Sequence, residues 1–189
     1  MRRLLNTVLS CLAMAALLCA CAPRELSDVT LIQTMALDGA GPIAVTAVGE
    51  GEAGPEVYRA EGDDLSAAQA ALQREGTTRL EATHVSQLVL GPEADVPGAL
   101  WAVAVHRESG CGATVWLTGE EAGAVLAAAE DPAGRLKSLE ENAGVPAPTV
   151  LEALSDLERE GRVTIPVLEL AGQELQATGE RVVEKGDAF

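Results

Sequence analysis

Apolar residues recur along the chain with two spacings, and these predict a succession of short strands and short helices. Runs rich in Val, Ile, Leu and Thr predict strands, which cover residues 29–35, 43–48, 57–60, 84–90, 113–117, 163–170 and 174–183. Apolar residues three or four apart, behind capping residues, predict helices, which cover residues 65–75, 99–106, 120–126, 136–142 and 149–160.

This order of elements predicts the fold class. Strands and helices alternate through the middle of the chain, and pairs of strands stand at both ends. We therefore expect one domain of the α/β (α+β) class, in which a mixed β-sheet is flanked by helices. Pro166 cannot donate a hydrogen bond to a neighbouring strand, so we expect its strand to lie at a sheet edge or to be irregular.

The first twenty residues have the pattern of an export signal. Arg2 and Arg3 precede a mostly apolar run from Leu4 to Leu18. This run is shorter than the roughly 20 apolar residues that a stable membrane span needs. A positive start, a short apolar stretch and a small residue before a cut are typical of a signal peptide. An ordinary secretory signal and an uncleaved anchor are the alternatives.

Cys21 is the position at which this signal matches a lipoprotein cleavage site. Lipoprotein signal peptidase requires a cysteine after the cut, a small residue before it and an aliphatic residue at −3. Ala20 and Leu18 meet the last two requirements. We therefore predict a lipoprotein signal peptide over residues 1–20, lipidation of Cys21, and a mature domain over residues 21–189.

The charge of the mature chain limits its partners. The whole sequence has 13 Lys+Arg against 29 Asp+Glu, a net charge of −16. Arg2 and Arg3 are the only charged residues before Cys21, so processing leaves 11 basic residues, 29 acidic residues and a charge of −18. Such a surface repels nucleic acid and anionic lipid head groups, so we expect no nucleic-acid partner.

Residue types that carry catalysis or bind metals are few and scattered. The two histidines, His84 and His106, could form a metal site only with Cys111 and a carboxylate, and no HExxH, CxxC or paired-histidine spacing is present. We interpret His84 as a structural residue that begins a strand, and Cys111 as a free thiol in a glycine-rich turn. We expect no catalytic residue, no metal and no cofactor.

Short motifs, in order along the chain, resemble those of a known lipoprotein family. They follow Cys21 and comprise Arg24-Glu25-Leu26-Ser27-Asp28, Ala36-Leu37-Asp38, Gly62-Asp63-Asp64-Leu65, His84-Val85-Ser86-Gln87-Leu88-Val89-Leu90-Gly91, Arg107-Glu108 and Val163-Thr164-Ile165-Pro166-Val167-Leu168. Together they resemble the N-terminal domain of the Ger(x)C-type lipoproteins, the C subunits of spore germinant receptors. Gln87 departs from the basic residue usual near that position. The family's further C-terminal domains have no counterpart here, so the chain resembles a short form, a degenerate copy or a fragment.

The resemblance implies a function. It implies a lipid-anchored, non-catalytic subunit of a germinant receptor complex that acts in spore germination. Its partners would be the integral membrane subunits of that receptor and, through the lipid on Cys21, the membrane. The protein would then lie on the extracytoplasmic side, at the inner spore membrane. The alternative is an extracytoplasmic lipoprotein that binds a small solute or is a weak hydrolase, with its pocket at the carboxyl ends of the central strands.

Arg24 and Leu26 are the residues that we expect to contact a membrane-embedded partner. Even a fully extended segment from Cys21 to Asp28 keeps the first strand within roughly 25 Å of the bilayer. An acidic body turns away from anionic lipid, which leaves this segment as the natural place of contact. The alternative is that the segment only packs against the start of the domain.

Overall fold

The computed structural model describes residues 29–51, 54–76, 78–106 and 110–186. Over these ranges the chain forms eight strands and five helices, in the order β1 (Val29–Asp38), β2 (Ile43–Gly51), β3 (Gly54–Gly62), α2 (Leu65–Glu75), β4 (Arg79–Glu81), β5 (Gln87–Leu90), α3 (Val96–Val105), β6 (Thr114–Thr118), α4 (Ala122–Ala128), α5 (Pro132–Glu141), α6 (Val150–Glu160), β7 (Arg162–Ala171) and β8 (Glu174–Glu184). Within these ranges no helix combines the length and the apolarity that crossing a membrane requires.

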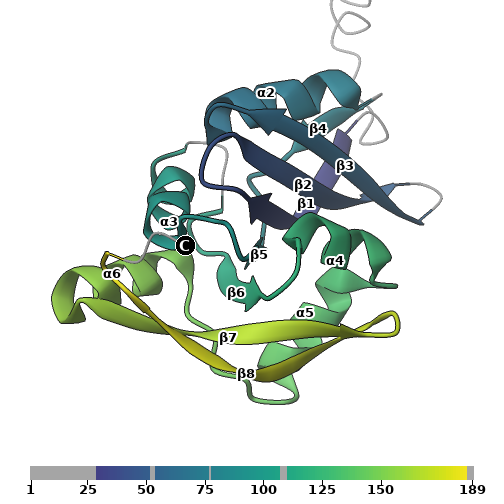
Figure 1. The fold of residues 1–189 in the computed structure, drawn as a ribbon. Helices are drawn as coiled ribbons and strands as arrows, with labels where there is room; N and C mark the ends of the chain where they lie inside the picture. Colours follow the sequence, from purple (N-terminus) through teal and green to yellow (C-terminus); the bar gives the residue numbers. More distant parts are fainter. Residues whose placement is uncertain (1–28, 52–53, 77, 107–109, 187–189) are drawn as a thin grey trace, which may run out of the picture.

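All eight strands belong to one twisted sheet (Figure 1). Its order is β3-β2-β1-β5-β6-β7-β8, and the short β4 pairs with the beginning of β1. Strands β1, β5, β6 and β7 run parallel, whereas β2, β3 and β8 join through antiparallel pairs at the two sides. The sheet is therefore mixed, with its parallel strands in the centre.

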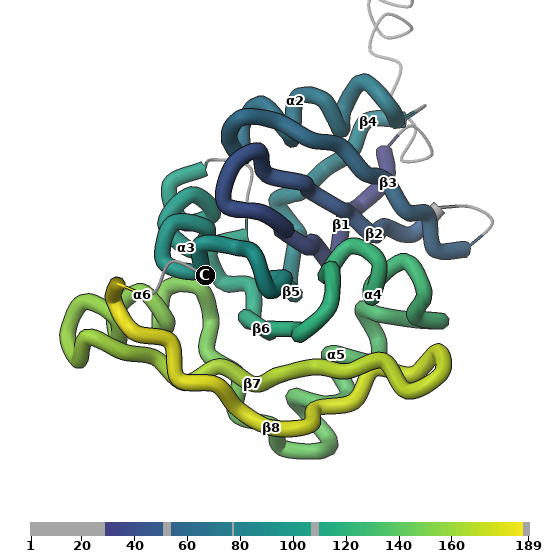
Figure 2. Tube along the Cα trace, in the orientation of Figure 1, coloured from purple at the N-terminus to yellow at the C-terminus, as the bar shows by residue number. Residues whose placement is uncertain are grey.

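Helices cover both faces of the sheet, because successive side chains of a strand point to opposite faces. Met35 and Leu37 of β1 join the core beneath α2, α3 and α6, whereas Ala36 joins the core beneath α4 and α5. Trp116 of β6 is fully buried in this second core. Figure 2 shows the chain passing through these layers. The predicted class, a single α/β domain with a mixed sheet flanked by helices, is confirmed.

The predicted helices are all present, and local signals explain their boundaries. Asp64 accepts a hydrogen bond from the Ala67 amide at 2.7 Å and caps α2. Thr149 and Glu152 form a reciprocal capping box at the start of α6, and Gly161 ends that helix in the left-handed conformation. These signals lie within four residues of each helix end, so they are readable from the sequence.

The strand predicted to begin at His84 begins instead at Gln87, and this corrects the role given to His84. Residues 83 and 84 form an exposed turn, which the Val85 amide closes by donating to the Ala82 carbonyl at 3.2 Å. The sequence also gave no signal for β4, because its three residues form a strand only through parallel pairing with β1.

Pro166 does not place its strand at the sheet edge, because β7 lies between β6 and β8. However, β7 pairs with β6 only at Val167 and Leu168, so the stretch that holds Pro166 has no partner on that side. The pairing with β8 also shifts register between Val167 and Leu168. The predicted irregularity is thus present.

Candidate functional site

The three residues assigned to lipidation and partner contact, Cys21, Arg24 and Leu26, lie outside the described residues. Their roles remain predictions. The described part of the chain begins at Val29, which opens β1 beside Arg79 of β4. The Arg107-Glu108 motif also lies outside the described ranges.

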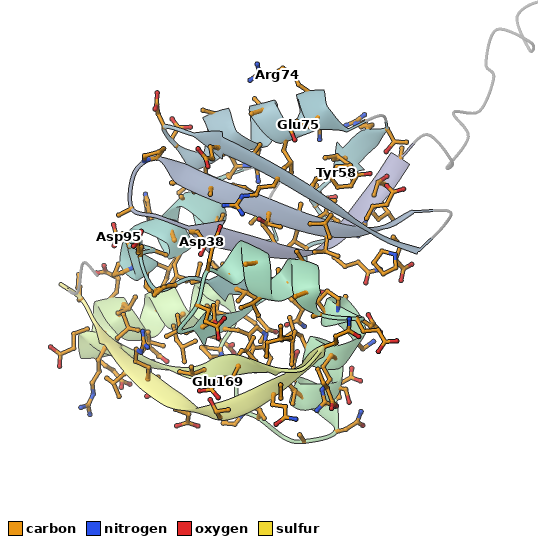
Figure 3. All side chains as sticks on the ribbon, turned by 45° about the vertical axis from the view of Figure 1, so that its right-hand side comes forward. Asp38, Tyr58, Arg74, Glu75, Asp95 and Glu169 are labelled. Atoms are coloured by element: carbon orange, nitrogen blue, oxygen red, sulfur yellow. The ribbon has the colours of Figure 1, made fainter. Side chains whose placement is uncertain are left out.

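The carboxyl ends of the central strands meet at Asp38, the last residue of β1 (Figure 3). Its Oδ1 accepts a hydrogen bond from the Ala122 amide at 2.8 Å, and its Oδ2 accepts one from the Gly123 amide at 2.9 Å. These amides open α4, whose N-cap residue Glu121 makes no capping hydrogen bond with its side chain. Asp38 therefore caps α4 from across the sheet, and its negative charge faces the positive end of the helix.

Gly91 completes this corner. It follows β5, and its amide donates to the Leu37 carbonyl at 3.0 Å. A Cβ atom at position 91 would overlap Oδ1 of Asp38. Asp38 and Gly91 each end an apolar run of the sequence, and here they pack directly on each other. Asp38 thus has the structural role of capping α4, and Gly91 leaves room for its carboxylate.

A depression of about 450 Å³ lies beside Asp38, where the sequence places the pocket of a solute-binding protein or weak hydrolase. Its rim holds the ion pair between Arg59 and Glu121, together with Glu61 and Glu93. Among the described residues that line it there is no serine, threonine, cysteine, histidine or lysine. The lining thus offers carboxylates and one guanidinium.

Gln87 has a structural role that the sequence did not reveal. Its Oε1 accepts a hydrogen bond from the indole Nε1 of the buried Trp116 at 2.6 Å. Its Nε2 donates to Oε2 of Glu140 at 3.3 Å, and the Thr114 hydroxyl donates to the same oxygen at 3.3 Å. A glutamine can accept and donate at once, so it links the indole of β6 to the carboxylate of α5.

The histidines and the cysteine considered as metal ligands are separated by the fold. His84 lies in the exposed turn before β5, Cys111 is an exposed free thiol, and His106 caps the C-terminal end of α3. Across the described ranges, no three residues among His, Cys, Asp and Glu are grouped so that they could hold a metal ion. That the fold needs no metal remains a prediction.

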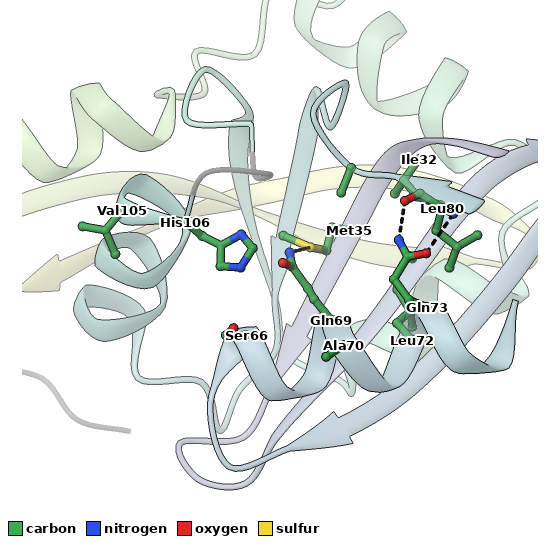
Figure 4. A pocket seen from close by; sticks show the side chains of 12 residues that line it. Ile32, Met35, Ser66, Gln69, Ala70, Leu72, Gln73, Leu80, Val105 and His106 are labelled. Atoms are coloured by element: carbon green, nitrogen blue, oxygen red, sulfur yellow. Dashed lines mark hydrogen bonds between the residues drawn. The ribbon is translucent and has the colours of Figure 1, made fainter. Parts of the chain in front are cut away.

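His106 instead lines a second hollow of about 450 Å³, between α2 and the C-terminal end of α3 (Figure 4). Most of its lining is apolar, from Ile32 and Met35 of β1, Leu72 of α2 and Leu80 of β4. Its lining residues come from β1, β2, α2, β4 and the end of α3, so no local pattern in the sequence indicates this hollow.

The outer face of α3 exposes two large apolar side chains. The helix holds no charged residue over its ten positions. Trp101 and Val105, one turn apart, are 63% and 58% exposed. In a chain with 29 acidic residues, an uncharged helix that exposes a tryptophan is typical of a contact surface.

Comparisons of this chain with protein-family models, with curated proteins and with solved structures found no match.

Proposed function

We propose that the protein is a lipid-anchored, non-catalytic subunit of a spore germinant receptor, held through Cys21 at the extracytoplasmic side of the inner spore membrane. Its partners are the integral membrane subunits of that receptor. Two features of the sequence support the proposal: the lipoprotein cleavage site, and the ordered motifs that resemble the Ger(x)C-type lipoproteins. The structural contact between Asp38 and Gly91 is in keeping with a scaffold role for these motifs.

The observation that best supports an interaction role is the exposure of Trp101 and Val105 on the outer face of α3. Tryptophan is among the residues that contribute most to protein interfaces, and the centre of an interface is depleted in charge. Trp101 and Val105 offer such a centre on a surface that is otherwise strongly acidic. We therefore add this face to Arg24 and Leu26 as a place where the membrane subunits bind.

Co-purification from spore membranes tests the proposal. We expect Trp101→Glu to reduce the retained membrane subunits at least tenfold, because a buried interface tryptophan commonly contributes about 2 kcal/mol or more. Leu151→Glu is the matched control, since Leu151 is a large apolar residue of α6 that is 54% exposed. Arg24→Glu and Leu26→Asp test the N-terminal contact. Equal retention by wild type and all these variants, at unchanged melting temperature, would contradict the proposed contacts.

The anchor is tested on the same membrane preparation. Mass spectrometry of the mature N-terminus should find a diacylglyceryl group on Cys21, and Cys21→Ala should be released or left unprocessed. A mature chain that begins at Ala22 or later would contradict lipid anchoring, whatever the result for the partners.

A further inference from the structure

The two ends of the parallel strands lie at opposite ends of the domain. Strands β1, β5 and β6 are parallel and in register, with Thr34, Gln87 and Thr114 side by side. The start of β1 and the turn before β6 therefore lie at one end of the sheet, which we call the amino end. Asp38 lies at the other end, where β1 finishes, and we call this the carboxyl end.

The carboxyl end is acidic. The depression beside Asp38 is lined by five carboxylates and one guanidinium, which belong to Asp38, Glu61, Glu93, Glu120, Glu121 and Arg59. Anionic lipid head groups repel such a surface within roughly a Debye length, which is about 8 Å at physiological salt. A bilayer with anionic lipid therefore disfavours an orientation in which the carboxyl end approaches it.

The amino end carries exposed arginines close to the start of β1. Arg79 is the first residue of β4 and pairs with Val29 in the parallel register of β4 and β1 (Figure 1). Its side chain is 60% exposed, and its guanidinium lies 3.6 Å from Glu81. Arg74, in the last turn of α2, is also exposed. A guanidinium group is well suited to contact a lipid phosphate.

The length of the segment between Cys21 and β1 also distinguishes the two ends. Eight residue steps lead from Cys21 to Val29, and they span about 28 Å when fully extended. The ten residues of β1 span about 30 Å. With the carboxyl end against the bilayer, the start of β1 would stand about 30 Å above it. The segment would then be stretched to its limit, which costs chain entropy.

We propose that the domain rests on the bilayer with the amino end of its sheet toward the lipid head groups and the acidic carboxyl end facing away. Arg79 contacts the lipid phosphates beside the anchor. This orientation rests on the anchor at Cys21 that the proposed function includes. It also brings the end of α3 toward the membrane subunits, because Val105 lines the same hollow as Leu80, the residue after Arg79.

Cys111 is a native probe of this orientation. It is an exposed free thiol in the turn before β6. Processing removes Cys11 and Cys19, and the lipid occupies Cys21, so Cys111 is the only thiol left for a label. The double variant Cys111→Ser and Ala40→Cys carries the same label in the exposed turn after Asp38.

The full mature chain, labelled with a fluorophore, is anchored in phosphatidylglycerol-containing vesicles that include a lipid with a head-group nitroxide. We expect the nitroxide to quench the label at position 111 and to leave the label at position 40 unquenched. Equal quenching at both positions in the anchored chain would overturn the orientation.

Charge reversal tests the contact of Arg79. Arg79→Glu should lower the quenching at position 111 by about half in these vesicles, because a cation beside anionic lipid becomes an anion. Arg59→Glu is the matched control, since it reverses an exposed arginine at the carboxyl end and should leave this quenching unchanged. Equal quenching in both variants would overturn the contact of Arg79 with lipid.

The anchor is measured on the same samples by flotation with the vesicles and by mass spectrometry of the N-terminus. A mature chain without a diacylglyceryl group would contradict the proposed anchor, and the orientation with it. An anchored chain whose label at position 40 is quenched would contradict the orientation alone.

Discussion

Asp38 joins three parts of the fold through one carboxylate. It ends β1, caps α4 through the amides of Ala122 and Gly123, and packs against Gly91 after β5. Because two amides at a helix start would otherwise lack acceptors, the carboxylate contributes to stability as a capping residue does.

Asp38→Ala should lower the free energy of unfolding by about 2 kcal/mol, the upper end of the range for a lost cap. Gly91→Ala should lower it by about 1–3 kcal/mol, because the new methyl group displaces the carboxylate. The double variant should cost less than the sum of the two, since both changes act on one contact. Urea denaturation measures all three, with Gly112→Ala, which has no close neighbour, as control. Strict additivity would contradict the contact.

Glu152 makes the stability of α6 depend on pH. The hydrogen bond from the Thr149 backbone amide, and then the one from the Thr149 hydroxyl, lower the pKa of Glu152 below its ordinary value of 4.5. A carboxyl group with a lowered folded pKa adds stability above its unfolded pKa and loses that contribution as pH falls through the folded pKa.

We therefore expect Glu152→Ala to melt at a lower temperature than the wild type at pH 7. The difference should shrink once pH falls below 4.5. Thermal melts of both proteins between pH 3 and pH 7 test this, and a difference that stays constant over that range would refute the role of the ionised carboxylate.

At the scale of elements, the short link from β3 to α2 depends on close backbone packing. Gly62 ends β3, and a Cβ atom there would lie 2.7 Å from the carbonyl carbon of Ala67 and 2.8 Å from Cα of Ala68. Both atoms belong to the first turn of α2, which cannot move without losing the cap at Asp64. Only glycine fits at position 62 without a steric clash with the backbone of α2.

Gly62→Ala should lower the free energy of unfolding by about 1–3 kcal/mol, as expected when a methyl group is forced into a packed site. Gly179→Ala in β8 is the control, because no atom lies within 4 Å of the added methyl group. Denaturant titration compares the two, and an equal effect at both positions would show that the packing against α2 is not the cause.

At the scale of the whole molecule, stability comes from the two cores on either side of the sheet. We expect the chain to fold in the presence of a strong chelator, with an unchanged melting temperature. A drop of several degrees would instead indicate a structural metal, whose loss removes binding free energy that belongs to folding.

The sequence alone determined the fold class, all five helices and most strands, because their signals are local. Caps such as Asp64 and Thr149 act on amides three residues away, and apolar spacing marks which face of a helix or strand is buried. The predicted lipoprotein signal also rests on a local pattern, and it remains a prediction because Cys21 lies outside the described residues.

Only the tertiary structure decided which distant residues meet. Asp38 caps a helix that begins 84 positions later, β4 exists only beside β1, and the hollow at Met35 is enclosed by α2, β4 and the end of α3. Each of these contacts follows from sheet order and register, which place segments side by side whatever their separation along the chain. Residue spacing carries no signal for such contacts, so the cap of α4 was not visible in the sequence.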